Sequence, residues 1–538
     1  MDWDVIVVGL GTAGTAAALA AARMGLRTLG VERTNAMGGQ YTSGCICFGQ
    51  RSPVESMLAF EREAERYGLV RAYETVPLAV KRAGDRIFSV TLVSDGRVRE
   101  ESAKAFIDAT GNGTLARLAG LPLRKGRPHD GAMARSVRAE LWKMDTGTIR
   151  PHYRNYMVDL GGDAESYART VEFLAGTRVT AYQGLKRQGR MLRPATLVGA
   201  REERRTVTEK IVTFRELLLE TPWPDPIFHG FGPEDYVAPD GKTAYESDEI
   251  QNWKEICYLP AFGYPYAIPY GTIVAKGVGN LLVPSKHMGV SHDCGGAIRM
   301  QQEMRKSGVA AACAVQVMLR KGCAARDVPY SELAPLLSRE GTLAKPRQKA
   351  VDTINGYSFG RLFSADEIVA ALAVPSVRGG EWWNSKAKDG PCERASYAYW
   401  NCWKTALSGT EEERTRLADR LADEMAKGGV GEGNFAVALG LMDDRRCLPP
   451  LRAIVKRPGS VADPVGPRIY PNRLKALTFL GRMRDEAVIP ELRAIIADGA
   501  RAFTADINVA GVFESRDVCR AATLALAEVA TCRRLLSV

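Results

Sequence analysis

The fold is decided by Asp4-Val5-Ile6-Val7-Val8-Gly9-Leu10-Gly11-Thr12-Ala13-Gly14, in a chain of 538 residues. Residues 5–8 are apolar and rich in β-branched side chains, which is the composition of a buried parallel strand. An Ala-rich run to about Met24 predicts a helix, and residues 27–31 predict a second strand that delivers Glu32 at its end. We therefore expect a strand–turn–helix–strand unit.

The glycines of this stretch have the spacing G-x-G-x-x-G, which in a strand–turn–helix context indicates dinucleotide binding. Gly9 permits the tight turn, Gly11 lets a diphosphate approach the backbone, and Gly14 lets the helix lie close to the strand. Backbone amides and the dipole at the helix N-terminus favour an anion. Glu32 can accept hydrogen bonds from the ribose hydroxyls of adenosine.

Two later features indicate which dinucleotide is bound. Glu32 is followed by Arg33 and the pair Gly38-Gly39, and Asp108-Ala109-Thr110-Gly111 ends another apolar segment. Both features resemble the glutathione-reductase-like superfamily of FAD proteins, in which a Gly-Gly loop lies near the flavin and an "ATG" strand end brackets the cofactor. The resemblance implies FAD as the cofactor. It also implies cofactor contacts from Arg33, Gly38, Gly39, Thr42, Thr110 and Gly111.

A second block extends the resemblance. Residues 278–283 resemble the late FAD strand of a bacterial FAD-dependent oxidoreductase family that groups with fumarate-reductase-like and heterodisulfide-reductase-like flavoproteins. The stretch 291–300, SHDCGGAIRM, resembles the segment before that family's closing helix. The similarity covers roughly residues 1–127 and 270–337. It departs in one detail, because Ala312 stands where the family has the second glycine of Gly-x-Ala-Ala-Gly.

Four residues of this block are candidates for the site. The resemblance implies that Gly279 and Asn280 contact FAD. His292 lies in the best-matching segment and has the chemistry of a general acid or base at neutral pH. Arg299 could clamp a substrate carboxylate or stabilise negative charge on reduced flavin. The alternatives are a buried structural histidine for His292 and a local salt bridge for Arg299.

The expected fold class is α/β, with a Rossmann-like FAD-binding domain that is split in the sequence. An inserted α+β substrate domain and a C-terminal all-α region are expected besides it. The expected boundaries are 1–127 and 270–337 for the FAD-binding domain, 128–269 for the substrate domain, 338–385 for a linker and 386–538 for the helical region.

The helical region contains an internal repeat. Pro449-Pro450-Leu451-Arg452-Ala453-Ile454 recurs 41 residues later as Pro490-Glu491-Leu492-Arg493-Ala494-Ile495. This period resembles HEAT repeats. A partial third copy is expected near residues 520–536. A short array of this kind could bind a protein partner or a second copy of the chain.

Composition and charge limit the partners and the cellular compartment that we expect for the protein. The net charge of +11 fits an Arg-rich surface or a field that attracts FAD and an anionic substrate. Basic residues are scattered rather than arranged with aromatics, so no nucleic-acid partner is expected. No apolar run or leader pattern indicates a membrane, and the eleven sparse cysteines fit a reduced, cytoplasmic protein. Cys45 and Cys47 are expected to be packing residues, and no metal site is expected.

These features predict an FAD-dependent oxidoreductase, either a dehydrogenase or an oxidase. It would remove hydride from a small polar substrate that is anionic, hydroxylated or an amine, and oxygen, a quinone or a partner protein would reoxidise the flavin. No second dinucleotide fingerprint and no Cys-x2-Cys series is present. Two alternatives stay open: a flavin-dependent C=C reductase of fumarate-reductase type, and an FAD-containing scaffold or redox sensor that binds a protein through its helical repeats.

Overall fold

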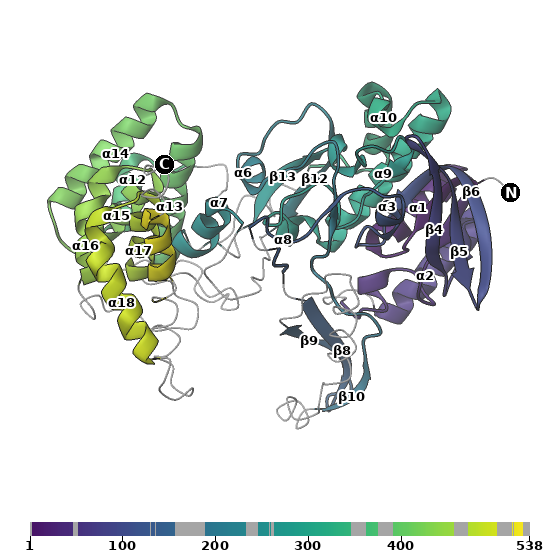
Figure 1. The fold of residues 1–538 in the computed structure, drawn as a ribbon, viewed down its shortest axis with the longest axis horizontal. Coiled ribbons are helices and arrows are strands. Elements are labelled where there is room, and N and C mark those ends of the chain that lie inside the picture. The colour runs from purple at the N-terminus through teal and green to yellow at the C-terminus, as the bar shows by residue number, and fades with distance from the viewer. Residues whose placement is uncertain are drawn as a thin grey trace. The chain divides into compact units, whose positions relative to one another are not determined.

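The chain forms two compact units in the computed structural model (Figure 1). Unit 1 comprises residues 1–239 and 264–346, and unit 2 comprises residues 240–263 and 347–538. The residues that the structure describes are 3–46, 52–129, 131–134, 136–156, 189–232, 246–257, 259, 263–345, 362–374, 391–456, 472–502, 519 and 521–530.

The core of unit 1 is a parallel sheet. Its central strand β1 (Trp3–Val8) lies between β2 (Thr28–Val31) and β6 (Arg97–Asp108). β3 (Val70–Ala72) pairs with β2, and β14 (Leu281–Leu282) pairs with β6, both in parallel. The order is therefore β3-β2-β1-β6-β14, and the carboxyl ends of all five strands meet at one edge. Ligands of open parallel sheets bind at this edge.

Layers cover both faces of the sheet. On one face β4 (Val76–Ala83) and β5 (Arg86–Ser94) form a meander with the first half of β6, and α3 (Thr114–Leu118) packs beside them. Their apolar side chains share one buried cluster with alternate residues of the parallel strands. Helices α1 (Thr12–Arg23) and α9 (Gln301–Lys321) lie on the sheet as well and pack against each other (Figure 1). Burial on both faces explains the continuous apolar run of β1.

The contact between α1 and α9 depends on Gly308. A Cβ atom at this position would lie 2.0 Å from the Ala13 carbonyl oxygen, so only glycine allows the observed approach. Ala312, which replaces the family's second glycine, is fully buried. One glycine is thus sufficient for close packing of the two helices here.

Smaller sheets follow the parallel one in unit 1. β8 (Ser136–Met144) lies between β9 (Ile149–Tyr156) and β10 (Gly189–Pro194), and all three are antiparallel. The short pairs are β7 (Leu123–Arg124) with β11 (Arg205–Thr206), and β12 (Pro226–Gly232) with β13 (Tyr264–Pro269). The other helices of unit 1 are η1 (Gly39–Tyr41), α2 (Pro53–Tyr67), α6 (Phe214–Leu218), η4 (Tyr270–Ile273), α8 (Gly295–Ile298), η5 (Ala325–Asp327) and α10 (Tyr330–Arg339).

Unit 2 is helical in the residues that the structure describes. Its helices are α7 (Asp248–Gln251), η3 (Asn252–Ile256), α12 (Ala365–Leu372), α13 (Pro391–Ser408), α14 (Glu411–Ala426), α15 (Glu432–Leu441), η6 (Arg445–Cys447), α16 (Leu448–Lys456), α17 (Asn472–Arg482), η7 (Glu486–Val488) and α18 (Ile489–Ala502).

Two expected boundaries need correction. The sequence predicts that residues 240–263 belong to the substrate domain, but in the structure they group with unit 2. There Trp253 packs edge-on against Trp400, with ring centroids 5.2 Å apart. Helix α12 lies inside the expected linker. It begins with a capping box in which Ser364 and Glu367 exchange side-chain and backbone hydrogen bonds. Residues 346–361 and 375–385 of that linker lie outside the described residues.

The sequence repeat of 41 residues corresponds to a repeated structure. Each copy is a helix, a residue with positive φ, a short 3-10 turn and a second helix; the positive-φ residues are Asp443 and Arg484. The copies are linked by Arg452, whose Nη2 donates to Asp485 Oδ1 at 2.6 Å. Of the expected third copy, residues 521–530 are helical, and residues 520 and 531–536 lie outside the described residues.

We predict that Gly308→Ala destabilises the protein, although alanine favours a helix by about 1 kcal/mol. The added Cβ meets backbone rather than a movable side chain, so the free energy of unfolding should fall by about 1–3 kcal/mol. Gly433→Ala is the control, because its Cβ would meet only side-chain tips, Ile454 Cδ1 at 3.3 Å and Asn472 Nδ2 at 3.7 Å. Chemical denaturation of the FAD-loaded proteins measures both, and a stabilised Gly308→Ala variant would contradict the prediction.

Candidate functional site

The glycine turn after β1 lies at the carboxyl edge of the sheet. Gly9 has φ +86°, and a Cβ atom there would lie 2.7 Å from Thr110 Cα. A Cβ at Gly14 would lie 1.8 Å from the Gly9 carbonyl oxygen, and one at Gly39 would lie 2.8 Å from Gly11 Cα. The structure thus brings together the two glycine segments and the "ATG" strand end, and any side chain at three of these positions would displace backbone.

Glu32 lies beneath the turn. It is only 5% exposed, and its Oε2 accepts a hydrogen bond from Leu10 N at 2.7 Å. Gly38 N donates to the Leu10 carbonyl oxygen at 2.8 Å, so the Gly-Gly loop is tied to the same residue. Thr42 is buried and donates to the Met37 carbonyl oxygen at 2.6 Å. Thr42 therefore shapes the loop through its side chain.

Lys286 places a cation at this edge. It follows β14, and a Cβ atom at Gly111 would lie 3.0 Å from its Cε. Its Nζ donates to the Ala200 carbonyl oxygen at 2.6 Å and lies 3.8 Å from Glu203 Oε1. Burial lowers the pKa of Lys286, Glu203 acts against this, and Arg33 and Arg299 lower the pKa further. The sequence predicts an FAD contact for Arg33 and a catalytic role for Arg299 but does not point to Lys286, because its position becomes clear only when β14 is placed beside β6.

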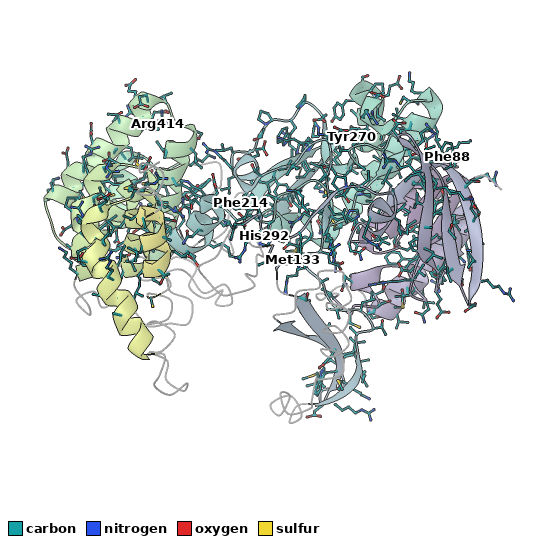
Figure 2. All side chains as sticks on the ribbon, viewed as in Figure 1. Phe88, Met133, Phe214, Tyr270, His292 and Arg414 are labelled. Atoms are coloured by element: carbon teal, nitrogen blue, oxygen red, sulfur yellow. The ribbon has the colours of Figure 1, made fainter. Side chains whose placement is uncertain are left out.

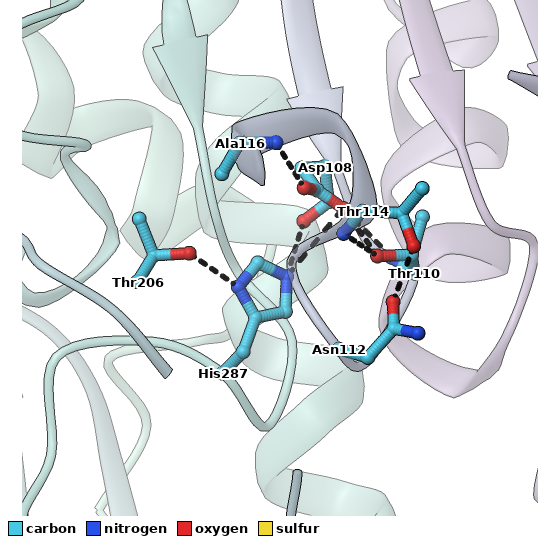
Figure 3. A network of polar contacts seen from close by, with 7 residues as sticks. All are labelled: Asp108, Thr110, Asn112, Thr114, Ala116, Thr206 and His287. Carbon is cyan, nitrogen blue, oxygen red and sulfur yellow. Dashed lines mark hydrogen bonds and ion pairs between the residues drawn. The ribbon is translucent and has the colours of Figure 1, made fainter. Parts of the chain in front are cut away.

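His287 closes a buried network around the "ATG" strand end (Figure 3). Asp108 Oδ1 accepts from the Thr110 backbone and side chain at 3.1 and 2.7 Å. His287 Nε2 lies 3.0 Å from the Asp108 carbonyl oxygen, and Nδ1 lies 2.9 Å from Thr206 Oγ1. Burial lowers the pKa of His287, and Asp108 only partly offsets this. The neutral ring therefore holds the strand end against β11.

His292 belongs to a second buried network. Its ring is fully buried, and Nδ1 lies 2.7 Å from Glu202 Oε2. Glu202 Oε1 lies 2.5 Å from Arg205 Nη1. The segment that carries His292 is fixed by Ser291, whose backbone N donates to the Val212 carbonyl oxygen at 2.8 Å. The structure thus gives His292 an acidic partner, which the sequence interpretation did not identify.

Gly279 and Asn280 do not lie at the cofactor edge. They precede β14, at the amino end of a strand whose carboxyl end faces the site. Asn280 Nδ2 donates to the Ile87 carbonyl oxygen at 2.8 Å, and Gly279 N donates to the Asp85 carbonyl oxygen at 2.6 Å. Both residues therefore join β14 to the meander, and the expected FAD contacts are corrected to a structural role.

The described part of the chain gives no indication of a cysteine pair, a metal site or a membrane-spanning helix. Cys45 is buried, and Cys47 lies outside the described residues. Within the ranges given above, no group of three or more His, Cys, Asp or Glu side chains could hold a metal ion. In the same ranges, no helix has both the length and the apolar character needed to cross a bilayer.

The geometry fits a dinucleotide diphosphate. Glycine backbone forms the turn and approaches the "ATG" strand end closely, and Lys286 places positive charge beside Gly111. An anion bound there would contact amides at the start of α1 and would neutralise that charge. Glu32, Gly38, Gly39, Thr110 and Gly111 complete the surroundings, whereas Gly279 and Asn280 contribute nothing to them.

A family model described as "FAD dependent oxidoreductase" matches residues 4–59, 48–195 and 178–337. No curated protein matches the chain. Several solved structures are similar to parts of it. A geranylgeranyl bacteriochlorophyll reductase-like protein from Thermoplasma acidophilum is 13% identical, with a TM-score of 0.33, over 63% of this chain and 84% of that one.

Two further structures match shorter stretches. THI4 from Thermovibrio ammonificans is 21% identical over 23% of this chain, with a TM-score of 0.21. Thioredoxin reductase from Lactococcus lactis is 25% identical over 20% of this chain, with a TM-score of 0.17. The chain spans 66% and 36% of these two structures, less than two thirds of each.

We predict that Gly39→Ala weakens FAD binding by about tenfold or more, equivalent to about 1.4 kcal/mol. The new Cβ would press on Gly11 and separate the two glycine segments. Gly120→Ala is a matched control, because Gly120 also has a positive φ, +75°, but a Cβ there would meet nothing within 4 Å. Titration of the two apoproteins with FAD measures the difference, and equal losses of affinity would contradict this role for Gly39.

We also predict that His287 makes the free energy of unfolding depend on pH. Because the pKa of His287 is lowered in the folded chain, the unfolded chain binds the proton first as the pH falls below about 6.5. Stability is therefore lost on acidification, with a slope of at most about 1.4 kcal/mol per pH unit. The free energies of unfolding of wild type and His287→Gln should converge between about pH 7 and pH 5. A constant difference would show that His287 is not responsible, and His129→Gln, at an exposed histidine, is the control substitution.

Proposed function

The chain belongs to the FAD dependent oxidoreductase family, and on that premise we propose that it removes hydride from a C–H bond of a small polar substrate. The enzyme is an FAD-dependent oxidoreductase and FAD is its cofactor. The observation that carries the proposal is the buried histidine–carboxylate pair of His292 and Glu202, which lies in the same unit as the glycine turn.

Bound FAD supplies the hydride acceptor. The chain's residues hold the cofactor and handle the proton: the glycine turn and Lys286 bind the diphosphate, and His292 accepts the proton of the substrate's O–H or N–H group. The substrate thereby loses one hydride from carbon and one proton from oxygen or nitrogen, and a C=O or C=N bond forms. Because the ring of His292 is fully buried, the substrate's reacting group must enter the polar interior that surrounds it.

That interior favours a polar substrate. Charged side chains are seldom fully buried unless they are paired or functional. Three are buried around His292: Glu202 and Arg205, which contact it, and its chain neighbour Asp293. Arg299 is half-buried and carries the charge to clamp a carboxylate. We therefore propose an alcohol, an amine or a carboxylate-bearing compound as the substrate.

Unit 2 supports a further part of the proposal. Its two structural repeats, linked by Arg452 and Asp485, have the helix-turn-helix arrangement of HEAT-like arrays. We propose that this unit binds a protein partner or a second copy of the chain. The eight described cysteines are all free thiols, which supports a reducing, cytoplasmic setting.

The direction of the reaction and the role of His292 can be tested together. We predict that His292→Ala keeps FAD but slows anaerobic bleaching of the flavin by a substrate at least about 10²-fold, the scale of losing a general base. His129→Ala, an exposed histidine, is the control. A panel of alcohols, amines and hydroxy acids is screened first with the wild type. Near-normal bleaching of His292→Ala would assign the histidine a structural role, and substrate-dependent reoxidation of reduced flavin would assign the enzyme to C=C reduction.

A further inference from the structure

Glu202 is a buried carboxylate with a close contact at each oxygen. Its Oε2 lies 2.7 Å from His292 Nδ1 and also accepts a hydrogen bond from Ala134 N at 2.7 Å. Its Oε1 forms an ion pair with Arg205 Nη1 at 2.5 Å. His292 and Met133, the chain neighbour of Ala134, are both labelled in Figure 2. Arg205 Nη2 also donates to the His292 carbonyl oxygen at 3.4 Å, so the pair holds the histidine at its ring and at its backbone.

The charge state of Glu202 follows from these contacts. Burial opposes ionisation, but the charge of Arg205 and the hydrogen-bonding contacts of His292 and Ala134 N outweigh it, and the pKa of the Glu202 carboxyl is lowered. An ionised carboxylate accepts hydrogen bonds and donates none. The ring nitrogen that faces it, Nδ1, therefore carries a hydrogen. Since neutral imidazole has only one N–H, the lone pair of neutral His292 is on Nε2.

The other buried histidine of this region has the opposite arrangement. His287 Nε2 faces the carbonyl oxygen of Asp108 at 3.0 Å, which only accepts. His287 Nδ1 faces the Thr206 hydroxyl at 2.9 Å, which can donate. His287 is thus the Nε2–H tautomer. Two histidines that are five positions apart in the sequence are expected to be in opposite tautomers because their partners differ.

We propose that Glu202, held in place by Arg205, is a positioning residue that keeps His292 in the Nδ1–H tautomer and makes Nε2 the atom that accepts the substrate proton. The catalytic consequence rests on the proposed function, whereas the tautomer does not. When Nε2 takes the proton, the positive ring lies against the Glu202 carboxylate, which stabilises it. The carboxylate itself stays ionised throughout.

The tautomer is measured by NMR of the FAD-loaded protein with ¹⁵N-labelled histidine. The chain has five histidines, and His292→Gln and His287→Gln assign the two relevant sets of signals. Wild type is expected to show a protonated Nδ1 in His292 and a protonated Nε2 in His287. In Glu202→Leu, which removes the acceptor, the His292 signals should move toward the other tautomer, while those of His287 stay unchanged. A protonated Nε2 in wild-type His292, or unchanged signals in Glu202→Leu, overturns the proposal.

A second variant guards against misfolding. Glu202→Leu leaves the Arg205 charge buried without its partner, which is destabilising, whereas Glu202→Leu/Arg205→Met removes both charges and replaces the pair with apolar side chains. Both variants should lose the Nδ1–H tautomer and reduce flavin at least about tenfold more slowly at saturating substrate, with KM changed by less than about threefold. Loss of the tautomer without a slower rate overturns the positioning role.

The two proposals fail in different ways. If His292→Ala bleaches flavin at a near-normal rate while wild-type His292 shows a protonated Nδ1 that depends on Glu202, the proposed function is overturned and the tautomer assignment is supported. If His292→Ala is slow but the tautomer does not depend on Glu202, the proposed function is supported and the positioning role is overturned.

Discussion

The structure depends on two close backbone–backbone contacts, each of which requires a glycine. Gly14 lets the first turn of α1 rest on the Gly9 carbonyl oxygen, and Gly308 lets α9 rest on the Ala13 carbonyl oxygen. Both contacts are on the same short stretch of chain, so α9 is fixed relative to the glycine turn with no side chain between them. The segment 285–299, which carries the candidate site residues, lies between β14 and α9 and inherits this placement. Because the two helices are closely packed, α9 and the segment that leads into it have little freedom to move relative to the glycine turn.

The charges around the site fall into two groups. Glu202 and Arg205 neutralise one another, and Glu32 is satisfied by backbone and side-chain donors of nearby residues. Lys286, in contrast, lies beside the "ATG" strand end, where burial lowers its pKa although Glu203 lies 3.8 Å away. A bound diphosphate would add a second anionic partner for Lys286.

Much of the site was predictable because its signals are local. Gly9, Gly11, Gly14 and Glu32 sit on one strand–turn–helix–strand unit, where spacing alone defines the geometry. Residues brought in by tertiary structure were not predictable in this way. Lys286 and Glu202 reach their partners only through the pairing of β14 with β6 and of β11 with β7.

The incorrect expectations have a physical pattern too. Gly279 and Asn280 were placed by their proximity in sequence to a late strand, but a strand has two ends, and these residues precede it. Helix α12 was missed although the capping box of Ser364 and Glu367 is readable, because the surrounding Lys, Gly and Pro residues suggested a linker. Composition averages over a whole segment, whereas a capping box indicates the residue at which a helix begins.

The two buried histidines show what a structure adds to a residue type. His287 and His292 are alike in chemistry and in burial, and both follow the same strand. Their neighbours differ: the carbonyl oxygen and the carboxylate of Asp108 lie at Nε2 of His287 and the Thr206 hydroxyl lies at its Nδ1, whereas a carboxylate held by Arg205 faces Nδ1 of His292. Both ring nitrogens of His287 therefore have fixed partners that tie the strand end to β11. In His292 the acceptor is at the other nitrogen, and this difference in surroundings, rather than sequence position, is what distinguishes the two histidines.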